Sequence, residues 1–391
     1  MTNLGIYIQV PFCQTKCTYC NFHTGVVSPD RFAPYSRAVC QEICNFNDLH
    51  GSVGVAWPSH SRPLDSAVDT VYFGGGTPSL LNPSLLREML CAVRGSFRSS
   101  FDEITLEADP ETIDAQKSDA WVASGINRIS LGSQSFVDEE LKAAGRRHRS
   151  ADIYRAVSIL RGAGICNISF DLIAGLPKQT GDSWRYSLSE AIALSPEHLS
   201  IYLMEIDEGS RLGLEVLQSG SRYSARELPS EEAMAEFYES GQAKLGAAGY
   251  QQYEISNWSR PGFASKHNLK YWRREPYLGF GAGAHSFSGL HRWANIHEPA
   301  GYVSAMSAGR PAVEQVEQVT SESALEEELF LGLRQLAGIN LARIERQYGV
   351  DLTDKVGRLA SNGMVEQQGD FLRLNPAKLS ISNEVFVELL R

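Results

Sequence analysis

Up to about residue 205 the chain alternates between short β-rich runs and amphipathic helical patterns, an order that few folds accept. The expected strands, rich in β-branched and aromatic residues, are residues 5–10, 70–73, 103–108, 128–132, 167–173 and 198–203. The expected helices between them include residues 31–45, 83–94, 151–163 and 183–193. Strands joined through helices run parallel, so the pattern predicts an α/β protein whose six units form a partial (β/α)6 barrel of the TIM type.

The pattern changes after this barrel. The next residues are irregular and rich in Gly, Tyr and Trp, and they are followed by two expected helices, residues 341–347 and 353–361, and two strands within 363–374. Residues 51–66 are expected to form an exposed loop inserted in the barrel. The expected divisions are a barrel core, a connecting region and an α+β region with a winged-helix-like module, in residues 1–205, 206–320 and 321–391.

The charge and the apolar content of the chain limit which kinds of partner, such as nucleic acid or a membrane, can be expected. Winged helices often bind DNA, but acidic residues outnumber basic ones in residues 321–391, and the whole chain has a formal net charge of −10. Because a phosphate backbone attracts a surplus of Lys and Arg, no nucleic-acid partner is expected. No stretch approaches the ~20 apolar residues that span a bilayer. The apolar residues 4–12 lack a basic leader, so a cytoplasmic protein is expected.

Three cysteines follow the first expected strand: Cys13, Cys17 and Cys20. Three thiolates on one loop can hold three corners of an iron-sulfur cube and leave one iron free for another ligand. The spacing resembles that of radical S-adenosylmethionine (SAM) proteins, in which the amino and carboxylate groups of SAM chelate the fourth iron. Two alternatives stay open, namely a Cys3His zinc site that includes His23 and a set of ordinary reduced thiols.

The other four cysteines are Cys40, Cys44, Cys91 and Cys166. An odd total of seven cysteines, spread through a long chain, argues against a disulfide framework. Because the four fall in helical or strand-like patterns, we expect them to fill the core.

Polar groups follow several of the expected strands. The turn Gly74-Gly75-Gly76-Thr77-Pro78 comes directly after the second strand, where glycines without a Cβ let the backbone approach a ligand. Glu107, Gln134 and Asp171 lie near the ends of the next three strands. Since strand ends converge on one mouth of a barrel, they predict a cofactor site, although each could singly cap a helix or satisfy a turn. Arg146 could pair with a ligand carboxylate or be a solvated surface charge.

Further along, the segment Lys266-His-Asn-Leu-Lys-Tyr-Trp272 places His267 among aromatic residues. A flat apolar macrocycle suits such a surface, with imidazole as an axial ligand of haem iron. The alternative is a histidine that is hydrogen-bonded in the core. The chain has no Cys-x-x-Cys-His motif, so covalent attachment of a c-type haem is not expected.

Together these motifs resemble the oxygen-independent coproporphyrinogen III oxidase-like family of radical SAM proteins, and within it the haem-chaperone branch. The resemblance covers nearly the whole chain, including Tyr7-Ile-Gln-Val-Pro-Phe-Cys13 and the His-Asn-x-x-Tyr-Trp motif. It implies that Cys13, Cys17 and Cys20 bind a 4Fe-4S cluster and that His267 binds haem. It also implies a SAM pocket lined by Tyr7, Tyr19, Gly75, Gly76, Thr77, Glu107, Gln134, Arg146 and Asp171.

Three departures from the family bear on function. Coproporphyrinogen dehydrogenases carry a further cysteine two residues after the third cluster ligand, where this chain has Phe22, and they are longer at the N-terminus. Gln9 stands where much of the family has His. The resemblance therefore favours a haem chaperone, which binds haem and a SAM-liganded 4Fe-4S cluster and transfers haem to apo-haemoproteins such as respiratory enzymes.

The alternative function is that of an oxygen-independent coproporphyrinogen III dehydrogenase, or of another radical SAM enzyme that acts on a tetrapyrrole. Phe22 argues against the dehydrogenase activity. Whether the chain is an enzyme and whether it forms a homodimer stay open.

Overall fold

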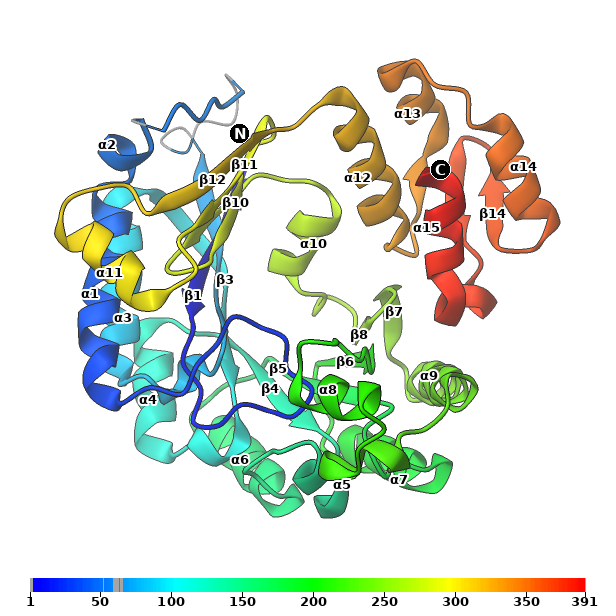
Figure 1. The fold of residues 1–391 in the computed structure, drawn as a ribbon, viewed down its shortest axis with the longest axis horizontal. Helices are drawn as coiled ribbons and strands as arrows, with labels where there is room; N and C mark the ends of the chain where they lie inside the picture. The colour runs from blue at the N-terminus through cyan, green and yellow to red at the C-terminus, as the bar shows by residue number, and fades with distance from the viewer. Residues whose placement is uncertain (1–2, 52, 59–62, 64–65, 391) are drawn as a thin grey trace.

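Figure 1 shows the computed structural model, which describes residues 3–51, 53–58, 63 and 66–390. The strands of its first half are β1 (Asn3–Val10), β2 (Ala67–Gly75), β3 (Arg98–Ala108), β4 (Arg128–Gln134), β5 (Ile168–Ala174) and β6 (His198–Leu203). They pair in this order, and each pair is parallel. The α/β partial barrel predicted from the sequence is therefore confirmed, and each expected strand overlaps an observed one.

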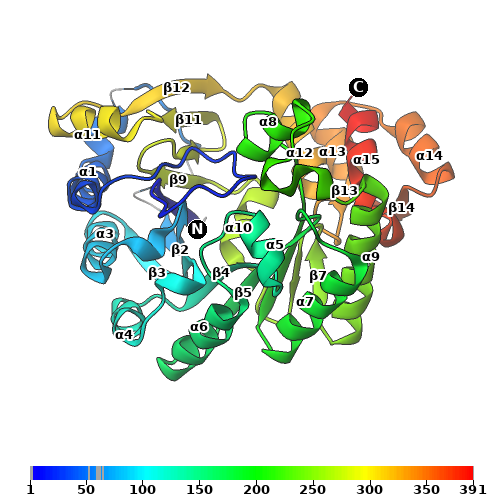
Figure 2. The same ribbon diagram turned by 60° about the horizontal axis from the view of Figure 1, so that its bottom comes forward.

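Helices separate these strands and cover the outer face of the curved sheet (Figure 2). They are α1 (Phe32–Cys44), α2 (Phe46–Gly51), α3 (Pro83–Ser96), α4 (Ala115–Ser124), α5 (Asp138–Ala143), α6 (Ser150–Gly162) and α7 (Gly181–Ala193). Side chains define where several of them begin: Asn82 accepts from the backbone N–H of Ser84 in α3, and Thr180 accepts from that of Ser183 in α7. On the inner sides of the helices, Trp121 and Trp184 are fully buried.

The barrel strands have an apolar outer face and a polar inner face. In β5, Ile168 and Phe170 are buried in the core beneath the helices, whereas Ser169 and Asp171 line a cavity on the inner face. Successive side chains of a strand point to opposite faces, so this alternation along the sequence sorts apolar from polar groups. The interior of the barrel is consequently a polar chamber, unlike the packed apolar interior of a closed TIM barrel.

The connecting region adds strands to both edges of the same sheet. Its strands are β7 (Gln251–Glu254), β8 (Asn257–Ser259), β9 (Tyr277–Phe280), β10 (His285–Phe287), β11 (His291–Asn295) and β12 (Val313–Gln318). β8 pairs with β6 at one edge, and β9 pairs in parallel with β1 at the other. The sequence pattern predicts irregular structure here, because strands of three to six residues are too short to show a clear alternation.

The helices of the connecting region are α8 (Arg211–Leu217), α9 (Glu231–Ala247), α10 (Lys266–Trp272) and α11 (Pro299–Ser307). α10, which carries the His-Asn-x-x-Tyr-Trp motif, lies between the two edges of the sheet on its inner side (Figure 1). It contacts β2, so it helps to close the open side of the partial barrel.

The C-terminal region consists of helices and a small antiparallel sheet of order β13-β15-β14. Its elements are α12 (Ser321–Leu333), β13 (Ile339–Asn340), α13 (Leu341–Tyr348), α14 (Thr353–Ser361), β14 (Val365–Gln368), β15 (Phe371–Leu374), a 3-10 helix η5 (Pro376–Ile381) and α15 (Ser382–Leu390). Gly369 forms the hairpin turn with φ of 59°, as a positive φ favours glycine. Two helices followed by a hairpin confirm the predicted winged-helix-like module (Figure 1). The C-terminal region contacts α10 through α12 and α9 through η5.

Two expectations about exposure need correction. Residues 52, 59–62 and 64–65 of the expected surface loop lie outside the described residues, but Trp57 is half-buried against Trp293, with ring centroids 5.9 Å apart. The prediction that the four other cysteines fill the core is wrong for Cys44, Cys91 and Cys166, which are exposed. A helical pattern does not say which face a small residue occupies, because its own apolar surface is too small to decide.

Candidate cofactor site at the mouth of the barrel

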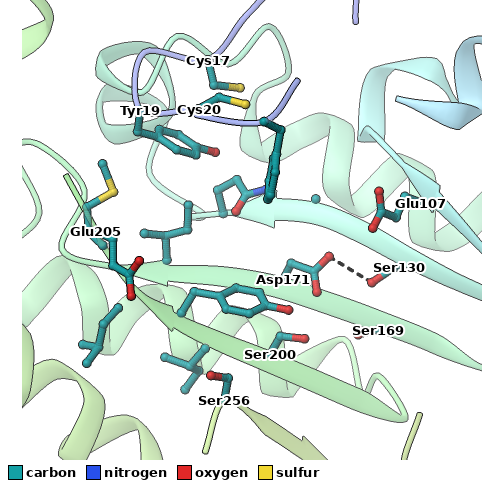
Figure 3. A pocket seen from close by; sticks show the side chains of 18 of the residues that line it. Cys17, Tyr19, Cys20, Glu107, Ser130, Ser169, Asp171, Ser200, Glu205 and Ser256 are labelled. Carbon is teal, nitrogen blue, oxygen red and sulfur yellow. Dashed lines mark hydrogen bonds between the residues drawn. The ribbon is translucent and has the colours of Figure 1, made fainter. Parts of the chain in front are cut away.

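The three cysteines lie on the loop that follows β1. Figure 3 shows Cys17 and Cys20 of this loop beside the cavity. The loop is closed at its base, where the N–H of Cys13 donates to the carbonyl oxygen of Gly25 at 3.0 Å. Its middle is held by Thr18, whose N–H donates to Ala144 at 3.0 Å and whose carbonyl accepts from Leu212 of α8 at 2.8 Å. The loop that carries the cysteines is thus held in place by hydrogen bonds of its backbone.

Cys13, Cys17 and Cys20 are free, half-buried thiols in the wall of a cavity of about 550 Å³. Nη1 of Arg146 donates to Sγ of Cys17 at 3.4 Å. Burial raises the pKa of Cys13 and the pKa of Cys20. Metal ligation offsets this effect, because the bound form of a cysteine is the thiolate.

The donor set fits an iron-sulfur cluster better than a single metal ion. Cysteines of a cluster each bind a different iron, so they need not converge on one point. Within residues 3–51, 53–58, 63 and 66–390, no three His, Cys, Asp or Glu side chains stand close enough to hold one ion. His23, the fourth ligand of the zinc alternative, packs its ring on that of His297 with centroids 4.5 Å apart.

The glycine-rich turn after β2 lies directly under the cysteine loop. The N–H of Gly76 donates to Val10 at 2.8 Å, and the N–H of Thr77 donates to Phe12 at 2.7 Å. A Cβ on Gly76 would stand 2.5 Å from the carbonyl oxygen of Phe12, and Gly75 has φ of 110°. Only glycine permits this close approach, so the turn and the loop share one wall of the cavity.

Arg146 is one of four basic residues in the cavity wall, with Lys16, Arg128 and Arg334. Its nearly buried guanidinium forms an ion pair with Asp109 and donates to the carbonyl oxygen of Gly132 at 3.0 Å. Asp109 also accepts from the hydroxyl of Thr77 at 3.0 Å. Asp109 was not among the predicted site residues, although it stands two residues after Glu107, directly beyond the end of β3.

Two carboxyl groups line the cavity from β3 and β5, which lie on either side of β4 (Figure 3). Glu107 accepts from the hydroxyl of Tyr72 at 2.9 Å and from the N–H of Gly75 at 3.0 Å, and burial raises its pKa to about 7. Asp171 accepts from the hydroxyl of Ser130 at 3.0 Å, and burial raises its pKa to about 6. A cationic ligand nearby would favour the ionised form of both carboxyl groups.

The structure brings most of the predicted SAM residues together in this cavity. Its wall includes Tyr19, Gly75, Gly76, Thr77, Glu107, Gln134, Arg146 and Asp171. Tyr7 lies behind this wall, where its hydroxyl donates to Gln9 at 2.7 Å and its ring stacks on Tyr72 with centroids 5.9 Å apart. Serines on the strands, such as Ser130 and Ser200, add further polar groups that sequence motifs did not single out.

His267 lies outside the cavity, buried in the body of the protein at 1% exposure. Its Nδ1 is 2.9 Å from the hydroxyl of Thr70, and its Nε2 is 2.8 Å from the hydroxyl of Tyr271. Burial, and then the nearby Lys270, lower the pKa of His267 to about 3. Since both ring nitrogens have partners, haem ligation by His267 requires one of these hydrogen bonds to open.

A partial parallel barrel with a three-cysteine loop after its first strand defines a protein of the radical SAM class. Residues 62–191 match the Radical SAM superfamily, and residues 319–377 match the HemN C-terminal domain. The fold is similar to that of coproporphyrinogen III oxidase (HemN) from Escherichia coli, with a TM-score of 0.79 and 22% identity over 100% of this chain and 89% of that one.

Relatives that match over most of their length indicate which family of the radical SAM class the chain belongs to. The chain is 33% identical to the heme chaperone HemW of Bacillus subtilis, over 97% of each chain. It is 37% identical to the heme chaperone HemW of Synechocystis, over 91% of this chain and 83% of that one. The chain therefore belongs to the HemW family.

Among the helices described here, none combines the length and the apolar character that crossing a bilayer requires.

Proposed function

We propose that this protein is a haem chaperone of the cytoplasm, which binds haem together with a SAM-liganded 4Fe-4S cluster and passes haem to apo-haemoproteins such as respiratory enzymes. The observation that carries the proposal is the position of α10. The helix with the His-Asn-x-x-Tyr-Trp motif borders the cysteine cavity, and Asn268 and the preceding Ser265 are part of the cavity wall. The haem motif and the cluster loop thus adjoin one chamber.

In this proposal each part of the chain has one task. Residues 1–205 hold the cluster through Cys13, Cys17 and Cys20, and residues 206–320 hold haem through the motif with His267. Residues 321–391 cover the chamber, as Leu379 and Asn383 belong to its wall. The SAM site is assigned to Tyr7, Tyr19, Gly75, Gly76, Thr77, Glu107, Gln134, Arg146 and Asp171.

The residues around the cluster loop bind and orient in this proposal. Arg146 supplies the positive charge for a ligand carboxylate, and the carboxyl group of Glu107 faces the polar end of the ligand. When bound, the cluster and SAM supply one-electron redox chemistry. The half-buried wall keeps bulk water away from that region of the cavity.

Phe22 supports the chaperone over a coproporphyrinogen dehydrogenase. It occupies the position of the further dehydrogenase cysteine, lines the cavity and is 66% exposed. A phenyl ring can neither donate a proton from sulfur nor ligate iron, so it cannot replace a cysteine there.

The proposal is tested with protein purified and reconstituted without oxygen. We expect haem titration to give a stable complex, and the loaded protein to transfer haem to an apo-b-type cytochrome faster than free haem enters it. Coproporphyrinogen III with SAM and a reductant is incubated in parallel, and no protoporphyrinogen is expected. Protein that retains no haem, or that turns over coproporphyrinogen, contradicts the proposal.

A further inference from the structure

A second cavity, of about 340 Å³, lies on the other side of α10, between that helix, the strands β9 to β11 and α12. Its walls include four aromatic side chains and two arginines: Tyr271, Tyr277, Phe287, Phe330, Arg274 and Arg292. We propose that this cavity is the haem seat, with Arg274 and Arg292 binding the two propionate carboxylates. The proposal deepens the proposed function and rests on it.

The aromatic walls suit a flat apolar ligand. The rings of Tyr271 and Tyr277 meet edge to face with centroids 4.7 Å apart, and Tyr277 contacts Phe287 at 6.3 Å. Phe330 of α12 is 36% exposed at the rim, as expected for a side chain that has room to cover an incoming macrocycle. Burial of aromatic faces against a porphyrin supplies apolar area without unsatisfied polar groups.

The two arginines supply the charge complementarity. Their guanidiniums lie over the ring of Phe287, with Arg292 at 4.2 Å and Arg274 at 5.4 Å from its centroid. Nε of each arginine donates to a different oxygen of Glu327, at 2.7 and 2.8 Å. Glu327 thus pairs with both guanidiniums, and Glu328 lies 3.5 Å from Nη1 of Arg274. In the part of the chain that the structure describes, no acceptor faces Nη2 of either arginine, so donors remain for a dicarboxylate ligand.

The backbone at Arg274 adds an independent observation. This residue follows α10 with φ of 52°, a left-handed conformation that is unfavourable for an L-residue such as arginine. In this conformation the Arg274 side chain lines the cavity and bonds to Glu327. Strained backbone that is held by its surroundings is typical of ligand-binding positions.

Tyr271 connects the second cavity with His267. It lines the cavity, and its hydroxyl bonds to Nε2 of His267. On the opposite side, the ring of His267 packs on Tyr72 at 5.2 Å, and Tyr72 donates to Glu107 in the cofactor cavity. The motif helix therefore separates the two cavities, so that a haem in the second cavity would lie next to the motif histidine without entering the SAM site.

The test compares haem with its dimethyl ester, in which both propionates are neutral. Arg274→Gln and Arg292→Gln are each expected to weaken haem binding about tenfold and to leave binding of the ester nearly unchanged, since one charge-assisted hydrogen bond is lost. Glu327→Gln removes the competing carboxylate and is expected to bind haem about fivefold more tightly. A merely structural role of the Arg–Glu–Arg cluster would not produce this gain. Arg373→Gln, on β15, is the matched control, because Arg373 also pairs with one glutamate.

The outcomes separate the two proposals. If wild-type protein binds no haem, both the proposed function and this haem seat are overturned. If wild-type protein binds haem but binds the ester equally well, or if both arginine variants keep the wild-type Kd, the seat is wrong while the chaperone function stands. Should the arginine variants fail to fold, judged by thermal unfolding, the ester comparison in wild-type protein and the Glu327→Gln variant decide the question.

Discussion

The hydroxyl of Tyr271 lies 2.8 Å from Nε2 of His267, so two residues of one motif, a helical turn apart, satisfy each other inside the protein. Nδ1 of His267 is bonded to Thr70 of β2, which is far away in the sequence. The motif histidine is thus hydrogen-bonded between a strand of the barrel and a tyrosine of its own helix. Whatever ligand it takes has to compete with the tyrosine.

Replacing Tyr271 with Phe tests this competition. Tyr271→Phe removes the partner of Nε2 while it keeps the ring, so we expect the free energy of unfolding to fall by about 1 kcal/mol. In the same variant haem should bind roughly fivefold more tightly, because no hydrogen bond has to open first. Chemical denaturation and haem titration measure the two effects. Weaker haem binding would mean that the hydroxyl itself contacts haem, and His267→Ala serves as the reference without imidazole.

Cluster assembly should depend on the loop cysteines alone. In Cys17→Ser we expect iron and sulfide content after anaerobic reconstitution to drop to less than half of the wild-type value, since a cube with two thiolate ligands is poorly held. Iron and sulfide analysis and the visible absorbance of the cluster provide the measurement. Cys44→Ser and Cys91→Ser are matched controls, because both cysteines are exposed and lie on the outer helices. An equal loss of iron in the control variants would contradict the assignment of the loop cysteines as cluster ligands.

The glycine turn should tolerate no side chain at Gly76. In Gly76→Ala the new Cβ would meet the backbone of Phe12 at 2.5 Å, so the cysteine loop has to move away from the turn. We expect SAM affinity to fall at least tenfold, because a displacement of about 1 Å misplaces the groups that hold the ligand. Isothermal titration of the reconstituted protein measures it.

The control for the Gly76→Ala variant is the same substitution at Gly95, a glycine of helix α3. A Cβ at Gly95 of α3 meets nothing within 4 Å, so Gly95→Ala should leave SAM binding unchanged and stabilise the fold by up to about 1 kcal/mol. An unaltered SAM affinity in Gly76→Ala would show that the turn does not form the SAM site.

A buried carboxyl group far from the cofactor cavity should make stability depend on pH. Glu42 of α1 accepts hydrogen bonds from Tyr302, Gly281 and Asn295, and burial raises its pKa from 4.5 to about 7. The folded state therefore holds the proton more tightly than the unfolded state does. The stability that this group contributes is fully present below pH 4.5 and is lost as the pH rises to about 7.

Glu42→Gln cannot titrate, so its comparison with the wild type isolates this effect. Relative to the variant, the wild type should lose up to about 3 kcal/mol of unfolding free energy between pH 4.5 and pH 7 and lose nothing more above that range. Urea unfolding at several pH values measures the difference. Glu236→Gln, at an exposed position on α9, is the control. A constant difference between Glu42→Gln and the wild type across this range would contradict the assignment.

Much of the fold was predictable because its pattern is local. The period of two along β5 and its neighbours places Asp171 on the inner face and Phe170 on the outer face, whatever the other strands do. The caps at Asn82 and Thr180 likewise act within one turn of a helix. The prediction of a site from the cysteine spacing and the glycine turn required only the order of the strands and helices along the chain.

Contacts between distant segments were not predictable in the same way. The environment of His267 depends on Thr70, and the second cavity depends on Arg292 of β11 meeting Glu327 of α12. Neither pair has a periodic signal, since the residues come together only after the sheet has curved and the C-terminal module has packed. The exposure of Cys91 also depends on which side of α3 faces the strands.

By itself, the sequence determined a parallel βα barrel, a loop that carries three closely spaced cysteines, and polar side chains along the inner faces of the strands. Each of these follows from residue types at short, regular spacings. Tertiary structure alone decided that the motif histidine is buried with both nitrogens engaged and that α10 separates two cavities. The physical reason is that hydrogen bonds and apolar burial between distant segments become favourable only when the whole chain has brought them together.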